Sequence, residues 1–168
     1  MSLAVLAAAL ATAPASFDPE SIEERAYAAA IAQAPPTVSD EAAKIAKDTE
    51  SDIAVGAKYA AQVDNELKAS TDQAKIERVD RIGRAMADIA NRTHASASWG
   101  DKRFFKFPYK FKVVKGKDVN AFSIPGGYIY VYEGLVDFCE TDDELAGVIG
   151  HEIAHASFRH VATLQREA

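Results

Sequence analysis

The sequence has one cysteine, Cys139, and no hydrophobic run of membrane-spanning length among its 168 residues. A single cysteine excludes an internal disulfide, and its position in an apolar stretch after Phe138 predicts a buried side chain rather than a nucleophile. The apolar run at 3–10 is too short to cross a bilayer, so no integral membrane span is predicted. Excess positive charge is also missing. The formal net charge of −6 argues against nucleic acid as the main partner.

The composition, 48% hydrophobic and 26% charged, is typical of a globular domain with a real core. Residues 1–16 are rich in alanine and leucine and carry no charged side chain. They resemble the core of a signal peptide, which would place the protein in the periplasm or outside the cell. The alternative is an alanine-rich helical tail on a cytoplasmic protein. Residues 17–48 are predicted to be a leader or linker, and residues 49–168 a folded domain.

Two amphipathic helices are predicted at the start of this domain, because apolar residues recur there at helical spacing. The first series is Ile53, Ala57, Ala60, Val63 and Leu67, and the second is Ile76, Val79, Ile82, Met86 and Ile89. Each is interpreted as a scaffold helix. The polar segment 91–100 that follows is predicted to be a loop, with its lone His94 in solvent rather than on a metal.

Three strands are predicted next. Residues 102–117 mix basic and aromatic side chains, as a nucleic-acid surface does. A half-buried strand at a sheet edge is favoured instead, because apolar and other residues alternate: Phe105, Phe107, Tyr109, Phe111 and Val113 with Lys106, Pro108, Lys110 and Lys112. Residues 119–124 and 128–132 are predicted to form a hairpin through the turn Pro125-Gly126-Gly127. The expected fold is therefore α+β: N-terminal helices, a small antiparallel sheet with a hairpin, and a final helix.

The strongest functional signal is His151-Glu152-Ile153-Ala154-His155. Residues four apart on an α-helix lie on one face, so both imidazoles could bind one metal ion with Glu152 beside them. This H-E-x-x-H spacing is that of zinc-dependent peptidases, in which the glutamate is the general base. The sequence therefore predicts His151 and His155 as ligands of Zn²⁺ and Glu152 as the catalytic residue. The alternative is that both histidines are simply packed in a core.

The motif is predicted to lie on a helix that starts after Thr141, because Thr141 and Glu144 have the spacing of a capping box. No proline follows, so the helix is expected to run from about 142 to 165. Apolar side chains surround nearly all of it, which predicts a buried helix. A stripe of small residues, Gly147, Gly150 and Ala154, would let a neighbouring backbone approach closely.

Several further motifs, in their order and spacing, resemble the M48 family of zinc metallopeptidases. They are Ile53 to Gly56, Val79 to Gly83, Asn120-Ala121-Phe122, Pro125 to Tyr132, Gly134-Leu135, Asp143 to Gly147 and the H-E-x-x-H itself. The resemblance covers about residues 50–168. It implies a zincin-like domain of the soluble bacterial branch that cleaves polypeptides, such as unfolded or misfolded proteins in quality control. It also implies that the strand with Asn120, Ala121 and Phe122 borders the cleft, where an extended substrate could add as a further strand.

The chain departs from that family in the third zinc ligand, a glutamate expected on a helix well downstream. Glu167 would lie about three helical turns beyond His155, and His160 would point to the opposite side of the helix. Upstream acids such as Glu133 and Asp137 have no supporting spacing. The chain is therefore expected to be the N-terminal part of an incomplete peptidase domain with little activity. The alternative is a non-catalytic, chaperone-like or regulatory module that binds polypeptide.

Overall fold

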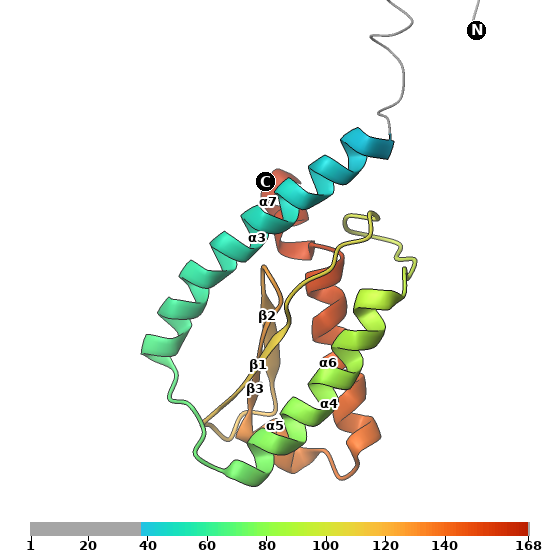
Figure 1. Cartoon of the computed structure of the whole chain (residues 1–168). Helices are drawn as coiled ribbons and strands as arrows, with labels where there is room; N and C mark the ends of the chain where they lie inside the picture. Colours follow the sequence, from blue (N-terminus) through green and yellow to red (C-terminus); the bar gives the residue numbers. More distant parts are fainter. Residues whose placement is uncertain (1–37, 168) are drawn as a thin grey trace, which may run out of the picture. The chain divides into compact units, whose positions relative to one another are not determined.

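The computed structural model describes residues 38–167, and residues 42–167 of these belong to one compact unit. The elements follow in the order α3 (Val38–Glu66), α4 (Gln73–Arg92), β1 (Lys110–Val114), β2 (Ala121–Ile124), β3 (Tyr128–Tyr132), α5 (Glu133–Phe138), α6 (Asp142–Ser157) and α7 (His160–Glu167) (Figure 1). The signal-like segment 1–16 and most of the leader 17–48 lie outside the described residues. Within the described part, no helix is long and apolar enough to cross a membrane.

The sheet has the strand order β1-β3-β2. β2 and β3 pair antiparallel, with Ile124 opposite Tyr128, so the predicted hairpin is confirmed. β1 pairs parallel to β3, with Lys110 opposite Tyr128. The prediction of a purely antiparallel sheet is wrong, because alternation along a strand reports which side chains are buried and carries no information on strand direction.

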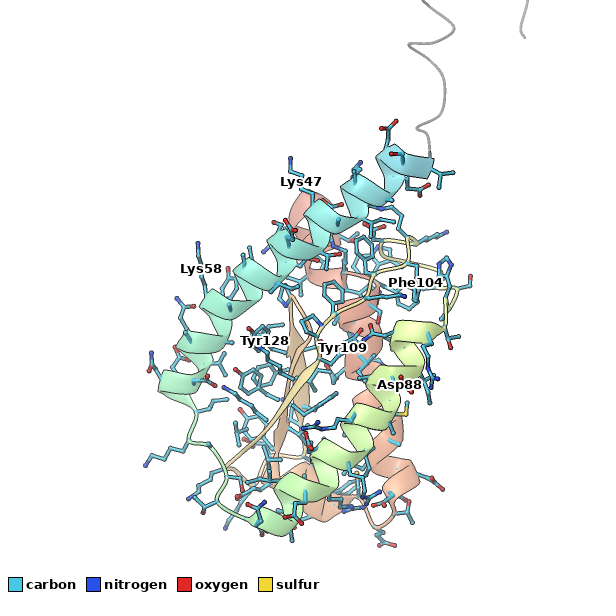
Figure 2. All side chains as sticks on the ribbon, viewed as in Figure 1. Lys47, Lys58, Asp88, Phe104, Tyr109 and Tyr128 are labelled. Carbon is cyan, nitrogen blue, oxygen red and sulfur yellow. The ribbon has the colours of Figure 1, made fainter. Side chains whose placement is uncertain are left out.

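The central strand, β3, is buried on both faces, and its side chains alternate between two apolar clusters. Ile129 and Val131 pack into the cluster formed with α4 and α6. Tyr128 and Tyr130 point to the other face, where they pack with Ala60 of α3. Figure 1 shows α4 and α6 on one side of the sheet and α3 on the other. In Figure 2 the labelled ring of Tyr128 lies between α3 and the sheet, whereas Lys58 projects away from α3.

The strand predicted within 102–117 is shorter than expected. Phe105 and Phe107 are buried and Lys106 between them is exposed, so the predicted alternation holds. Only residues 110–114, however, pair with another strand. At Phe107 the side chain of Asn91 takes the place of a neighbouring strand: its Oδ1 accepts from the backbone N–H, and its Nδ2 donates to the carbonyl. This segment is therefore extended without being part of the sheet.

The buried face of α3 matches the predicted apolar face only in part: Ala60 is buried, and Val63 and Leu67 pack beside it. Asp52, Gly56 and Ala60 are buried, whereas Ala57 is exposed. Gly56 lies against the carbonyl of Pro125, and a Cβ at this position would be 1.8 Å from that oxygen. A close backbone contact and a buried carboxylate thus define the packing of α3. Neither feature is visible in a search for apolar periodicity.

The helix predicted for 142–165 is interrupted. α6 ends at Ser157 and α7 begins at His160, and Arg159 between them has a left-handed φ of 51°. A non-glycine residue takes up this conformation only where other contacts compensate. The guanidinium of Arg159 is buried among the acidic side chains of Asp48, Asp52 and Asp101. The prediction of one continuous helix failed at this residue.

Only one face of α6 is buried, so the prediction of a helix buried all round is also wrong. The buried residues are Leu145, Ile149, Ile153 and Ala156. At Gly150 the neighbour is the side-chain Cε of Met86 on α4, 2.9 Å from where a Cβ would lie, so the predicted close approach of a backbone is not found there. A Cβ at Gly147 would meet nothing within 4 Å, and His151 is exposed. The motif histidine thus faces away from the core.

Candidate metal centre

α6 presents the motif residues on consecutive turns of a well-anchored helix. Its N-terminus has a complete capping box: Glu144 N–H donates to Thr141 Oγ1 at 3.2 Å, and Thr141 N–H donates to Glu144 Oε2 at 3.1 Å. Its buried face packs against α4 and the sheet. The opposite side carries the exposed His151 and the half-buried His155, and the half-buried Glu152 lies between this side and the buried face. The anchored backbone therefore sets the positions of all three motif residues.

The two motif histidines turn the same ring nitrogen toward each other. His151 Nε2 and His155 Nε2 lie 3.1 Å apart, with ring centroids at 4.7 Å and ring planes at 81°. Two imidazole nitrogens bound tetrahedrally to one zinc at about 2.0–2.1 Å would lie about 3.3 Å apart. The observed separation fits two ligands of one zinc ion.

A third protein ligand does not accompany this pair in the part of the chain that the structure describes. Across residues 38–167, no group of three or more histidine, cysteine or acidic side chains is arranged to hold a metal ion. Glu133 accepts a hydrogen bond from Ser70 at 2.5 Å, and Asp137 pairs with Lys75 at 2.6 Å. Both upstream acids that could have approached the site therefore have partners elsewhere.

The sheet brings an edge strand beside this helix. Among the strands of residues 38–167, β2 pairs with β3 alone, and α6 packs against it. Ser123, Ile124 and Pro125 line a small cavity together with His155. Phe122 instead stacks on Tyr130 at 5.0 Å, and Asn120 accepts from the N–H of Tyr132 at 3.1 Å. The C-terminal half of β2 thus lies nearest His155, while the role of Asn120, Ala121 and Phe122 in substrate binding stays a prediction.

Comparison with known proteins identifies the family. Residues 73–166, more than half of the chain, match the model of peptidase family M48, and this range contains the whole H-E-x-x-H helix. The chain belongs to peptidase family M48. The family is zinc-dependent, which agrees with the donor set on α6.

Curated relatives agree with this assignment. The metalloprotease LoiP of Escherichia coli is 37% identical over 100 residues, which is 58% of this chain and 39% of LoiP. The metalloprotease YcaL of the same organism is 32% identical over 108 residues, which is 57% of this chain and 42% of YcaL. The E. coli beta-barrel assembly-enhancing protease is 33% identical over 57 residues, which is 34% of this chain and 12% of that protein. The chain thus spans less than half the length of each of these relatives.

In this M48 chain the break after α6 places a third histidine beside the site. His160 Nδ1 lies 2.8 Å from His155 Nδ1, and their ring centroids are 4.8 Å apart. The helical-wheel prediction that His160 points to the opposite side is wrong, because it assumed an unbroken helix. His160 meets the nitrogen of His155 that faces away from His151, so it does not join the Nε2 pair. Burial lowers the pKa of His160, which favours its neutral form.

The break itself is stabilised by a buried ion network that the sequence did not reveal. Arg159 donates to both carboxylate oxygens of Asp52, at 2.5 and 2.8 Å, and to Asp101 at 3.2 Å. Burial alone would raise the pKa of Asp101, but hydrogen bonds from Arg103 and Arg159 outweigh it and lower the pKa to about 2. The partners lie far apart in sequence, so no local motif signals them.

The remaining histidine and the cysteine have structural contacts. His94 Nε2 lies 2.9 Å from the carbonyl oxygen of Lys102, and its ring stacks on Phe104 at 5.5 Å. Cys139 is buried in the cluster with α4 and α6, which confirms the prediction, and burial raises the pKa of its thiol. A raised pKa disfavours the thiolate, so Cys139 is a poor nucleophile.

Proposed function

We propose that this chain carries the zinc-binding helix of a metalloendopeptidase, with His151 and His155 as ligands and Glu152 as the general base. The observation that supports it most is the 3.1 Å separation of the two Nε2 atoms, on a helix within the residues that match family M48. The described residues supply two of the three protein ligands that catalytic zinc sites have. Zinc binding by this chain is therefore expected to be weak.

Zinc bound there would lower the pKa of a water molecule to about 7 and polarise the substrate carbonyl. Glu152 lies about 100° around the helix from His151 and about 60° from His155, so its carboxylate is beside the face that carries the metal ligands. It would accept a proton from the attacking water and pass it to the leaving amine, a role that contributes about 10²–10⁴-fold to rate. His151 and His155 would orient the metal, and their anchored helix limits the movement of both rings.

The proposed substrate is an extended polypeptide that pairs with β2. An edge strand offers unpaired N–H and C=O groups, and a substrate strand can use them. The other edge of the sheet is less open, because β1 is bridged at Val114 by Ala69. Unfolded and misfolded proteins present such segments, so we propose a role in quality control. The name of one relative connects that protein with β-barrel assembly.

We further propose export to the periplasm or beyond, from the signal-like composition of residues 1–16. After expression in a bacterium, the mature protein should appear in the periplasmic or secreted fraction, shortened near Ala13 or Ala15. Recovery of the full-length chain only from the cytoplasm would contradict export.

Zinc titration and casein cleavage test the proposed enzyme. We expect His151→Gln and His155→Gln to remove measurable zinc binding, because each deletes one ligand of an already incomplete set. Glu152→Gln should retain zinc binding and lose whatever casein cleavage the chain has. His94→Gln is the matched control and should bind zinc as the original chain does. Zinc binding that survives both ligand substitutions, or cleavage that survives Glu152→Gln, would refute the proposal.

A second candidate is a non-catalytic module that binds polypeptide. Two observations within residues 38–167 favour it: β2 pairs with another strand on one side only, and no three-ligand metal cluster is present. Binding of an unfolded peptide that survives both EDTA and Glu152→Ala, without cleavage, would support this candidate over the enzyme.

A further inference from the structure

Both ring nitrogens of His155 have an imidazole partner. Its Nε2 lies 3.1 Å from His151 Nε2, and its Nδ1 lies 2.8 Å from His160 Nδ1. A neutral imidazole has one N–H and one bare nitrogen, and only the bare nitrogen can bind a metal. The partner of Nδ1 therefore decides whether Nε2 is available as a ligand.

The backbone carbonyl of Trp99 sets the direction of the hydrogen bond between His155 and His160. His160 Nε2 lies 3.4 Å from the Trp99 oxygen, a long hydrogen bond in which the carbonyl can only accept. The proton of a neutral His160 is therefore on Nε2, and its Nδ1 is bare. The short 2.8 Å contact then requires His155 to donate from Nδ1, which leaves the lone pair of His155 Nε2 directed toward His151.

The loop 99–101 and the break at Arg159 together position the ring of His160. The ring lies 4.8 Å from the Trp99 ring and 6.0 Å from the Phe158 ring. Gly100 has a φ of 97°, and a Cβ there would be 2.7 Å from His160 Cδ2. Asp101 N–H also donates to the carbonyl of Phe158 at 2.8 Å. This loop therefore covers His160 with a backbone that only glycine permits.

We propose that His160 is a positioning residue: by accepting a hydrogen bond from His155 Nδ1–H, it holds His155 in the tautomer whose Nε2 binds the metal. This inference rests on the proposed zinc site. Partners of this kind fix the ring orientation and tautomer of a metal-binding histidine, and their loss typically weakens metal binding about 10–100-fold. The chain uses an imidazole where many metal sites have a carboxylate or a carbonyl.

The tautomer can be read directly from the metal-free chain. At about pH 8, above the ordinary histidine pKa of about 6.5, long-range ¹H–¹⁵N spectra distinguish protonated from bare ring nitrogens. We expect His155 as the Nδ1–H form and His160 as the Nε2–H form. In His160→Phe, which keeps a ring beside Trp99 but has no acceptor, the Nδ1–H signal of His155 should no longer dominate. A predominant Nε2–H form of His155 in the original chain would overturn the inference, whether or not that chain binds zinc.

Zinc affinity gives the second measurement. His160→Phe should weaken binding about 10–100-fold, whereas His160→Gln, whose amide oxygen can accept from His155, should recover most of the loss. His94→Gln, which alters a histidine bonded to the Lys102 carbonyl, should change nothing. Equal affinities for the Phe variant and the original chain would overturn the inference. An original chain with the expected tautomers but no zinc binding would instead refute the proposed function and leave the assignment of His160 Nδ1 as acceptor supported.

Discussion

The two ends of α6 are stabilised by contacts of different range. At the N-terminus Thr141 and Glu144 exchange two hydrogen bonds across three residues, and both side chains are exposed. At the C-terminus the helix stops beside Arg159, whose side chain is 4% exposed and binds Asp52, 107 residues earlier in the chain. The first end can form in an isolated helix. The second end depends on α3 and the loop 99–101 being in place, so the position of His160 beside His155 is a property of the folded domain.

The largest loss of stability is expected from a substitution at the C-terminal end of α6. Arg159→Met removes the guanidinium and leaves the Asp52 carboxylate buried without its partner, which typically costs about 3–5 kcal/mol. Urea unfolding measures this loss as a fall in the free energy of unfolding. Arg84→Met is the matched control, because Arg84 forms an exposed pair with Asp80 and should change stability by less than about 1 kcal/mol. Similar losses in the two variants would show that the buried network is no more important than a surface pair.

The same contrast explains which features were accessible from the sequence. The capping box, the hairpin, the strand at 128–132 and the i, i+4 spacing of His151 and His155 are all local patterns, and the structure has each of them. A helical wheel places His160 correctly only if the helix continues. An arginine within a helical pattern gives no sign that its side chain will be buried and end the helix.

Other errors have the same origin. Asp52 and Gly56 join the correctly predicted Ala60 on the buried face of α3 through contacts with Arg159 and Pro125, whereas the apolar pattern had also selected the exposed Ala57. The parallel pairing of β1 with β3 depends on the path of the chain between them, which alternation does not encode. In both cases residues distant in sequence decide the structure: which face of α3 is buried, and in which direction β1 pairs. The close approach of His151 and His155 was predictable because both residues lie on one helix.

Lowering the pH is expected to have an intermediate effect on the free energy of unfolding. The pKa of Asp101 is lowered from 3.8 to about 2 in the folded protein. A depressed carboxyl pKa contributes stability that is complete above pH about 4 and is lost as the pH falls toward 2. The contribution is on the order of 2 kcal/mol, because one pKa unit corresponds to about 1.4 kcal/mol. In Asp101→Asn, urea unfolding between pH 5 and pH 2 should show a shallower loss of stability.

Asp142, in the first turn of α6, provides the control for this experiment. Hydrogen bonds from Arg78 and Arg81 lower its pKa as well, but the carboxylate is exposed to solvent. Solvent screens such pairs, so Asp142→Asn should alter the pH dependence less than Asp101→Asn does. A larger effect from Asp142→Asn would mean that the N-terminal end, not the buried network, dominates acid stability.

The smallest loss of stability is expected from a substitution in the capping box at the N-terminal end of α6. Thr141→Ala removes the acceptor for Glu144 N–H and should cost about 1 kcal/mol, whereas Thr141→Ser keeps a hydroxyl and should cost less. Because Thr141 lies at the opposite end of α6 from His155, Thr141→Ala should leave zinc affinity unchanged. Arg159→Met should weaken it, since Arg159 stabilises the turn that brings His160 to His155. If zinc affinity fell equally in both variants, general stability of α6 rather than its C-terminal contacts would control the metal site.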